Sequence, residues 1–174
     1  MLIGDLVCLG PLLEADGPVL FNWLNDRRLA LSNGPFRPMD QAKFAGWFGG
    51  AGADPTRVIF AIRDRRDMRL IGYVQMINIQ PVHRNAELGI LIGAAGDRDR
   101  GVGQEAMRLA LGFCWRDLNL HRVALFVVGD NPRAVHVYLK VGFAVEGCMR
   151  QAAYVDGAFC DITMMGMLRP EGDL

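Results

Sequence analysis

Lysine, cysteine and histidine are scarce in this sequence of 174 residues. Only Lys43 and Lys140 are lysines among 19 basic residues, and 19 acidic residues balance them to a formal net charge of zero. A chain without excess positive charge has no bulk attraction to nucleic acid or to an anionic membrane. No apolar run approaches the roughly 18 residues of a membrane span, and the first residues lack the features of a signal peptide. We therefore expect a cytoplasmic protein that binds neither nucleic acid nor a membrane.

Cysteine and histidine are too scattered to indicate a metal centre. The four cysteines include no C-x-x-C pair, and the three histidines show no ligand-like spacing. We therefore expect neither a disulfide framework nor a bound metal. Cys114 falls on the apolar side of a predicted helix, where a free cysteine behaves as a small core residue.

Apolar residues make up 51% of the chain, and its length suits one domain with a substantial core. Strands are predicted at 6–9, 57–63, 70–79, 86–92, 122–128, 143–149 and 159–168, with 151–157 joining the last two. Helices are predicted after Asp16, after Asp40, from Gly103 and after Asn131. This order predicts a single α/β (α+β) domain over 1–174, with a mixed, mostly antiparallel sheet flanked by helices. One parallel strand–loop–helix–strand crossover is expected within it.

Residues 87–106, ELGILIGAAGDRDRGVGQEA, are the most informative segment. An apolar strand leads into a glycine-rich loop, and the loop opens directly into an amphipathic helix. Such a loop directs several backbone N–H groups at one small volume, at the positive end of a helix dipole. Gly101 and Gly103 let the backbone approach an anion without a Cβ in the way. The segment predicts a site for an unbranched diphosphate, and hence a nucleotide-like cofactor.

Other interpretations of the loop fit the residues less well. In a P-loop, lysine and serine or threonine are required where Val102 and Gly103 stand. A dinucleotide fold agrees with Gly101-x-Gly103-x-x-Ala106, but the loop is long and only about seventy residues follow it. A helix start without a ligand would not explain why arginines and glycines gather beside it.

The pattern Arg98-x-x-Gly101-x-Gly103 resembles the Q/R-x-x-G-x-G/A signature of the GCN5-related N-acetyltransferase (GNAT) superfamily, in which the loop holds the pyrophosphate of acetyl-CoA. Residues 131–143, NPRAVHVYLKVGF, resemble the N-x-x-A-x-x-x-Y-x-x-x-G-F block of the same family. Residues 23–26 and 156–162 resemble its ribosomal-protein acetyltransferase-like branch. Together these motifs, in the right order, cover nearly the whole chain and imply a GNAT fold.

The resemblance implies how acetyl-CoA would be held. Amides of the loop would take the pyrophosphate, Arg98 or Arg100 would add a charge-assisted contact, and the other arginine would lie in solvent. If a bulge near Gly89 splays this strand from 122–128, a free edge would pair with the pantetheine arm, and an N–H there would stabilise the oxyanion. The expected cofactor-binding residues are Ile90, Leu91, Ile92, Arg98, Arg100, Gly101, Val102, Gly103, Gln104 and Asn131.

Two catalytic residues are expected. By resemblance, Tyr138 lies near the cofactor sulfur and protonates the departing thiolate, a general-acid step worth roughly 10²–10⁴-fold. The alternative is an aromatic residue that only packs on the inner face of a short helix. Glu87 is the candidate general base for the acceptor amine, acting directly or through water. Its alternative is a strand carboxylate that makes a salt bridge.

The expected reaction moves an acetyl group from acetyl-CoA to a primary amine of a small molecule or a protein N-terminus. It would proceed by direct attack in a ternary complex, because no cysteine or serine lies where a nucleophile is needed. A non-catalytic acyl-CoA sensor is the alternative of another class, followed by a dinucleotide-binding oxidoreductase. A homodimer is compatible with the family. The candidate acceptor-side residues are Trp23, Asn25, Asp26, Phe36, Trp47, Tyr154 and Asp156.

Overall fold

The computed structural model describes residues 1–31 and 34–171, whose eight strands follow the order β1-β2-β3-β4-β5-β6-β8-β7. The strands are β1 (Leu2–Ile3), β2 (Val7–Gly10), β3 (Val58–Asp64), β4 (Leu70–Gln80), β5 (Asn85–Ile92), β6 (Arg122–Val128), β7 (Ala144–Val155) and β8 (Ala158–Leu168). The α-helices are α1 (Gly17–Asn25), α2 (Arg27–Ala30), α3 (Gln41–Gly49), α4 (Val102–Arg116) and α5 (Pro132–Val141), and the 3₁₀ turns are η1 (Glu14–Asp16), η2 (Gly50–Gly52) and η3 (Ala95–Asp97).

The sheet is mixed and mostly antiparallel, with β5 and β6 as its parallel pair. This confirms the fold class expected from the sequence, including the strand–loop–helix–strand crossover. The two-residue strand β1 and the short helix α2 were not predicted. Within the described part of the chain, no helix is long and apolar enough to cross a membrane.

The chain divides into two compact units. The first unit contains residues 1–12, 54–124 and the described residues from Met167 onward. The second unit contains the described residues of 13–53 and 125–166. The glycine-rich loop and Glu87 belong to the first unit, whereas Asn131 and Tyr138 belong to the second.

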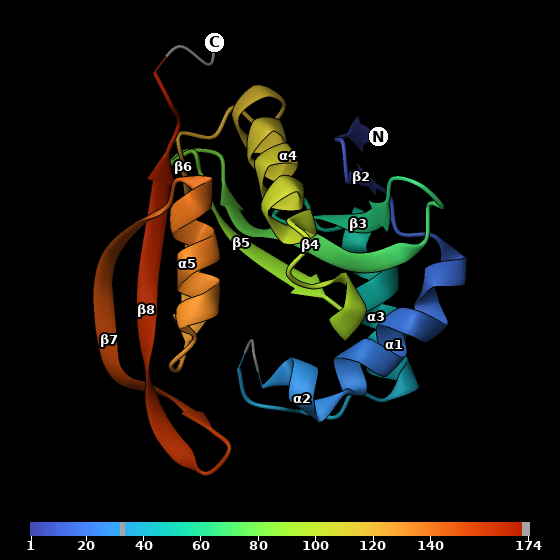
Figure 1. The fold of residues 1–174 in the computed structure, drawn as a ribbon, viewed down its shortest axis with the longest axis horizontal. Helices are drawn as coiled ribbons and strands as arrows, with labels where there is room; N and C mark the ends of the chain where they lie inside the picture. The colour runs from blue at the N-terminus through green and yellow to red at the C-terminus, as the bar shows by residue number, and fades with distance from the viewer. Residues whose placement is uncertain (32–33, 172–174) are drawn as a thin grey trace. The chain divides into compact units, whose positions relative to one another are not determined.

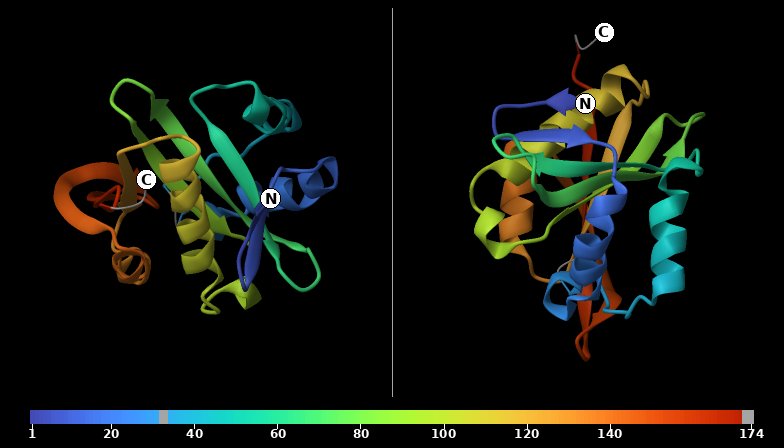
Figure 2. Two further views of the ribbon diagram at one scale, coloured as in Figure 1. Left: turned by 90° about the horizontal axis from the view of Figure 1, so that it is seen from above. Right: turned by 90° about the vertical axis from the view of Figure 1, so that its right-hand side faces the viewer.

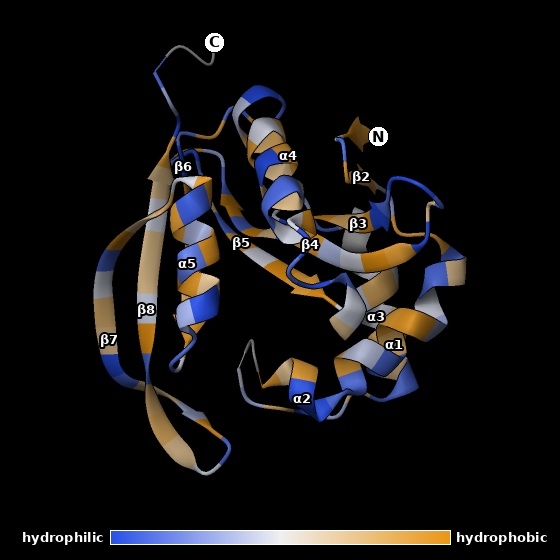
Figure 3. Cartoon of the chain, in the orientation of Figure 1, coloured by the Kyte–Doolittle hydropathy of each residue, from blue (hydrophilic) through white to orange (hydrophobic). Residues whose placement is uncertain are grey.

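The first unit is a layer of antiparallel strands with α4 across one face (Figures 1 and 2). Its strands are rich in β-branched and aliphatic residues, and Figure 3 shows β4 and β5 largely in the hydrophobic colours. Ile62 and Val74 on the strands and Met107 on α4 are fully buried. Each such side chain contributes roughly 1.5–3 kcal/mol through burial, so the face beneath α4 is the core that holds the loop's two flanking elements in place.

Near Gly89, strand β5 is paired differently on its two sides. Gly89 pairs with Gln75 in the regular β4–β5 register, and the register shift falls in β4, where Asn78 has a φ of 53°. The close backbone approach lies at Gly72, where a Cβ would come within 2.0 Å of the carbonyl oxygen of Leu91. On the other side of β5, the parallel pairs with β6 end at Glu87 and Ala124, so the expected separation of these two strands near Gly89 agrees with the register, whereas the bulge itself lies in β4.

The second unit buries aromatic residues between its N-terminal helices. The ring of Phe44 on α3 lies 5.4 Å from that of Phe21 on α1, edge to face, and 5.5 Å from that of Phe48. Such pairs add to the stabilisation from buried area. On α5, Figure 3 shows polar and apolar colours alternating around the helix, as in a helix with one buried side.

The β7–β8 hairpin is longer than predicted, and the expected connection at 151–157 is wrong. The two strands are joined by Asp156 and Gly157, with φ of 50° and 86°. Asp-Gly with positive φ at both positions favours a type I′ hairpin turn. A register irregularity at Gln151, which has a φ of 52°, separates the two halves of β7 and breaks the alternation that would have marked it as one strand.

Candidate functional site

The glycine-rich loop connects β5 to α4 in the first unit. After Ile92 the chain makes the 3₁₀ turn η3, passes through Asp99 at a φ of 60°, and reaches Gly101 at a φ of 80°. Gly101 is the N-cap residue of α4 in the left-handed conformation, which glycine adopts without a Cβ clash. The helix begins at Val102, one residue earlier than predicted.

The start of α4 presents backbone donors that the helix itself does not use. The first helical hydrogen bond runs from the N–H of Glu105 to the carbonyl oxygen of Gly101, at 3.1 Å. The N–H groups before it, up to that of Gln104, have no intrahelical acceptor. Because the N-cap is glycine, no side chain caps them. These donors, at the positive end of a helix of 15 residues, have the geometry of an anion site.

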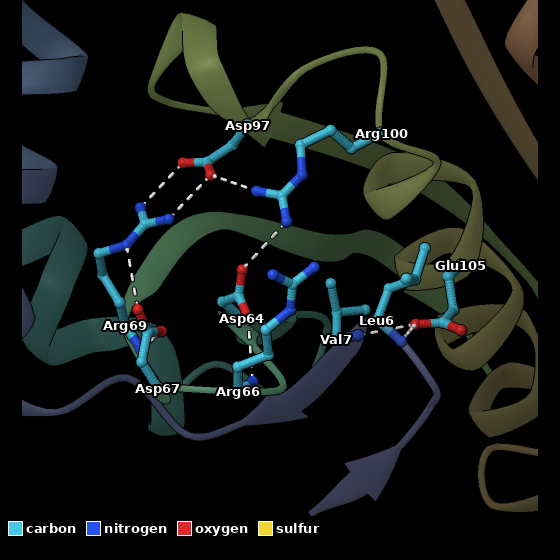
Figure 4. Close-up of polar contacts among 9 residues, drawn as sticks. All are labelled: Leu6, Val7, Asp64, Arg66, Asp67, Arg69, Asp97, Arg100 and Glu105. Atoms are coloured by element: carbon cyan, nitrogen blue, oxygen red, sulfur yellow. Dashed lines mark hydrogen bonds and ion pairs between the residues drawn. The ribbon is translucent and has the colours of Figure 1, made fainter.

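Both arginines of the loop contact protein groups, so neither lies simply in solvent as was expected of one of them. The Arg98 guanidinium donates to the carbonyl oxygens of Ile92 and Gly93, at 3.3 and 3.4 Å. The Arg100 guanidinium lies 3.3 Å from the carboxylate of Asp97 (Figure 4). These contacts are long, so either guanidinium can exchange them for a better acceptor at small cost.

Asp97 is a residue of this loop that sequence reasoning missed. It is buried in η3, and its carboxylate accepts two hydrogen bonds from the Arg69 guanidinium, at 2.9 and 2.8 Å. The hydrogen bonds from Arg69 hold the pKa of Asp97 below its usual range, although burial opposes them. No sequence signal links the two residues, because they are 28 positions apart and meet only when β4 pairs with β5.

The sequence did not indicate the structural role of Glu105, in the first turn of α4. Its carboxylate accepts hydrogen bonds from the backbone N–H groups of Asp5, Leu6 and Val7, at 2.9, 2.7 and 2.7 Å; Figure 4 draws those from Leu6 and Val7. An acidic residue in the first helical turn is ordinarily explained by the helix dipole. Here it also ties the β1–β2 turn to α4, and so fixes the helix whose N-terminus forms the candidate anion site.

Glu87 lies on β5, where it pairs with Ile77 on one side and with Ala124 of β6 on the other. Its carboxylate accepts a hydrogen bond from the Asn78 side-chain amide at 2.9 Å. It therefore has a hydrogen-bond partner, and it forms no salt bridge with the described residues.

The strand edge expected to hold pantetheine begins further along β5. The β5–β6 register pairs Asn85 with Arg122, Ala86 with Val123 and Glu87 with Ala124. Residues 90–92 pair with β4 on their other side and lie beyond these three parallel pairs. Their predicted role in holding the cofactor stays a prediction.

In the second unit, Asn131 and Tyr138 lie on α5, as expected from the motif. The Asn131 side chain accepts a hydrogen bond from the N–H of Ala134 at 3.1 Å, which confirms it as the N-cap. Gly142 ends the helix at a φ of 119°. The Tyr138 ring packs 6.3 Å from that of Phe143, and burial raises the pKa of the Tyr138 phenol. The phenol is thus protonated at neutral pH, the state in which it can donate a proton.

Several of the acceptor-side candidates have structural partners in the second unit. Asn25 exchanges hydrogen bonds with the backbone of Met39, at 3.1 and 2.8 Å, and Asp26 caps α2. Asp156 forms an ion pair with Arg27. Tyr154 is exposed and packs edge to face against Phe159, with ring centroids 5.0 Å apart. These contacts explain the polar candidates as parts of the local structure.

Two other kinds of catalysis need an activated thiol or a group of metal ligands. Burial raises the pKa of the Cys114 thiol to about 12, so that thiol stays protonated and is a poor nucleophile. Across residues 1–31 and 34–171, no three histidine, cysteine or acidic side chains are grouped as metal ligands.

The model of the acetyltransferase (GNAT) domain matches residues 7–144 of the sequence. The chain belongs to the GNAT acetyltransferase family. This confirms the family that the motifs at 98–103 and 131–143 indicated. Enzymes of the family use acetyl-CoA as acetyl donor, which agrees with a diphosphate site at the start of α4.

The chain is 34% identical over 110 residues to the spermidine N(1)-acetyltransferase of Vibrio cholerae, covering 63% of this chain and 62% of that protein. It is 26% identical over 99 residues to the ribosomal-protein-serine acetyltransferase of Escherichia coli, covering 57% and 55%. These alignments therefore span little more than half the length of the curated relatives. The crystal structure of spermidine N-acetyltransferase from Vibrio cholerae in complex with CoA and spermine has a TM-score of 0.87 and 28% identity, covering 95% of this chain and 96% of that one.

Proposed function

We propose that this protein transfers an acetyl group from acetyl-CoA to a primary amine by direct attack in a ternary complex. One observation carries the proposal: α4 starts at an uncapped glycine whose following N–H groups have no intrahelical acceptor. A diphosphate needs several donors converging on one place, and backbone N–H groups supply them. Similarity to a family member solved with CoA supports coenzyme A as the source of that diphosphate.

The residues at the start of α4 fit such a ligand. A Cβ on Gly103 would meet its nearest neighbour, Ile92, at 3.9 Å, so the protein itself leaves space there. Glycine at this position therefore serves an approaching ligand better than it serves the helix, where it costs about 1 kcal/mol relative to alanine. We assign Gly101–Gln104 to the diphosphate, Arg98 and Arg100 to charge-assisted contacts, and Ile90–Ile92 to the pantetheine arm.

The proposed chemistry uses two side chains. The amine nitrogen attacks the acetyl carbonyl carbon, a C–N bond forms, and the C–S bond breaks. Glu87 takes the proton that the attacking amine loses, directly or through water, and Tyr138 donates a proton to the departing thiolate. The support for Tyr138 is its place in the N-x-x-A-x-x-x-Y motif and the raised pKa of its phenol. Asn131 is assigned to the cofactor arm on the same motif.

For the acceptor we propose a small polyamine. The support is that the relatives found by sequence and by structure include spermidine acetyltransferases. A protein N-terminus is the second candidate, supported by the similarity to a ribosomal-protein-serine acetyltransferase. Both acceptors are primary amines and require the same transfer step.

Release of free thiol from acetyl-CoA would test this function. The full chain would be assayed with spermidine, with spermine and with a short peptide that begins with serine. We expect thiol release with a polyamine, and mass spectrometry should show one acetyl group added to the product. Binding of CoA without thiol release for any amine would instead support a non-catalytic acyl-CoA sensor. Binding of NADH in preference to CoA would support the dinucleotide alternative.

We further propose a cytoplasmic location and a single N-acetyltransferase domain over 1–174. The location is supported by the sequence features described above. The single domain is supported by the family match over residues 7–144. A homodimer remains a prediction from the family. Size-exclusion chromatography with light scattering would measure the mass of the assembly and so decide between a monomer and a dimer.

A further inference from the structure

Four charged side chains form a cluster beside the diphosphate loop in the first unit (Figure 4). Asp64 ends β3, Arg69 precedes β4, Asp97 lies in η3, and Arg100 immediately precedes the N-cap of α4. They come from two separate stretches of the sequence, the β3–β4 turn and the loop itself. The cluster thus connects the loop to the β3–β4 turn, which lies outside the sequence motifs described above.

The contacts within this cluster differ in strength. Arg69 holds Asp97 through two parallel hydrogen bonds of 2.9 and 2.8 Å, the geometry of a strong bidentate pair. Arg100 lies 3.3 Å from Asp97 and 3.6 Å from Asp64, distances that make weaker contacts. Asp97 is therefore neutralised chiefly by Arg69. Arg100 is held loosely, and 38% of its side chain is exposed.

A buried carboxylate beside an anion site is a problem for binding. The Asp97 side chain is only 5% exposed, so solvent screens its charge poorly. An uncompensated charge there would repel a diphosphate and would also hold the Arg100 guanidinium, which already lies 3.3 Å away, more firmly against Asp97. In a poorly solvated site the attraction between two close opposite charges is strong, which is enough to hold Arg100 away from a ligand.

We propose that Arg69 is a positioning residue for coenzyme A: by neutralising Asp97, it leaves the Arg100 guanidinium available to the diphosphate. The inference rests on the proposed function, because it assumes that the loop binds this ligand. It assigns a role in cofactor affinity to a residue 29 positions before Arg98, in a turn outside the loop. The proposal also explains why Asp97 and Arg100, with opposite charges, lie three positions apart in the loop.

The test compares three variants of the full chain by calorimetric titration with CoA, with thermal melting measured in parallel. Arg69→Met removes the neutralising charge, and we expect the Kd for CoA to rise about tenfold, equivalent to about 1.4 kcal/mol. Arg69→Met combined with Asp97→Asn removes both charges, and we expect the Kd to return to within about threefold of wild type. Arg66→Met removes an arginine of the same turn that forms no hydrogen bond or ion pair with Asp97, and it should leave the Kd unchanged.

The recovery in the double variant is the decisive result. If Arg69 only stabilises the fold, the double variant, which lacks the whole pair, should bind CoA no better than Arg69→Met, and this would overturn the proposal. An equal loss in Arg66→Met would mean that overall charge, and not Asp97, controls affinity, and would also overturn it. If Arg69→Met does not fold, Arg69→Lys replaces it, with a smaller rise expected and an unchanged Kd contradicting the proposal. Failure of wild type to bind CoA would refute the proposed function itself.

Discussion

The Asn78 side-chain amide donates a hydrogen bond to the Glu87 carboxylate at 2.9 Å, from a position where β4 leaves its regular register. The φ of Asn78 is 53°, a conformation that asparagine and glycine tolerate better than other residues. The irregular backbone of β4 thus aims a donor at the carboxylate that we propose as general base. Without that donor the carboxylate would be free to turn away.

Glu87→Gln keeps the shape of the side chain and the hydrogen-bond acceptor but cannot take a proton. We expect kcat to fall by roughly 10²–10⁴-fold with the KM for acetyl-CoA nearly unchanged, as measured by thiol release. Asn78→Gly preserves the positive φ and removes only the donor, so a smaller fall in kcat is expected. If Glu87→Gln turns over at the wild-type rate, the base is another group or bulk water.

Tyr138→Phe removes one hydroxyl group from a half-buried ring. We expect kcat to fall by roughly 10²-fold or more, because the thiolate would leave without a proton, while the Kd for CoA stays close to that of wild type. Since burial raises the pKa of the phenol, ionisation of Tyr138 should not limit the rate below about pH 10. A variant with full activity would assign Tyr138 to packing against Phe143 alone.

Gly103→Ala tests whether glycine at the helix start serves the ligand. The added Cβ meets no protein atom closer than 3.9 Å, so the free energy of unfolding should stay the same or rise by about 1 kcal/mol. The affinity for CoA should nevertheless fall. Gly96→Ala is the matched control: it lies in the same loop, a Cβ there has no neighbour within 4 Å, and its φ is not positive. Equal affinities for CoA in wild type and Gly103→Ala would remove that glycine from the site.

The pH dependence of stability should reveal the Asp97–Arg69 pair. The hydrogen bonds from Arg69 lower the pKa of Asp97 in the folded state. A depressed folded pKa contributes stability that is fully present above the unfolded value of about 4 and is lost as pH falls through the folded value. The melting temperature of wild type should therefore exceed that of Asp97→Asn near neutral pH, and the two should converge as pH is lowered below about 4. A difference that stays constant with pH would mean that the pair makes no charge-dependent contribution.

The sequence was enough to predict the crossover, because its signals are local. The apolar run of β5, the glycines at 101 and 103 and the periodicity of α4 all lie in the continuous stretch 85–116. Which apolar side chains of α4 are buried depends on its packing: Val102, Met107 and Trp115 are buried, whereas Leu109 and Phe113 are only partly buried.

The ionic contacts of the site were beyond prediction because they join distant segments. Arg69 and Asp97 are 28 positions apart, and Glu105 meets Val7 across 98 positions. Charge and spacing alone do not distinguish an arginine that holds the loop from one that faces solvent. The long β7–β8 hairpin was predictable in part. Asp156-Gly157 is a strong signal for a two-residue turn, although a longer connection was predicted there.

The central claim is that the start of α4 binds the diphosphate of coenzyme A. Calorimetric titration of the full chain with CoA, with NADH titrated under the same conditions, tests it most directly. We expect saturable heat with CoA at one equivalent per chain, little heat with NADH, and weaker CoA binding in Gly103→Ala. Absence of heat with CoA, together with a melting temperature that CoA does not raise, would contradict it.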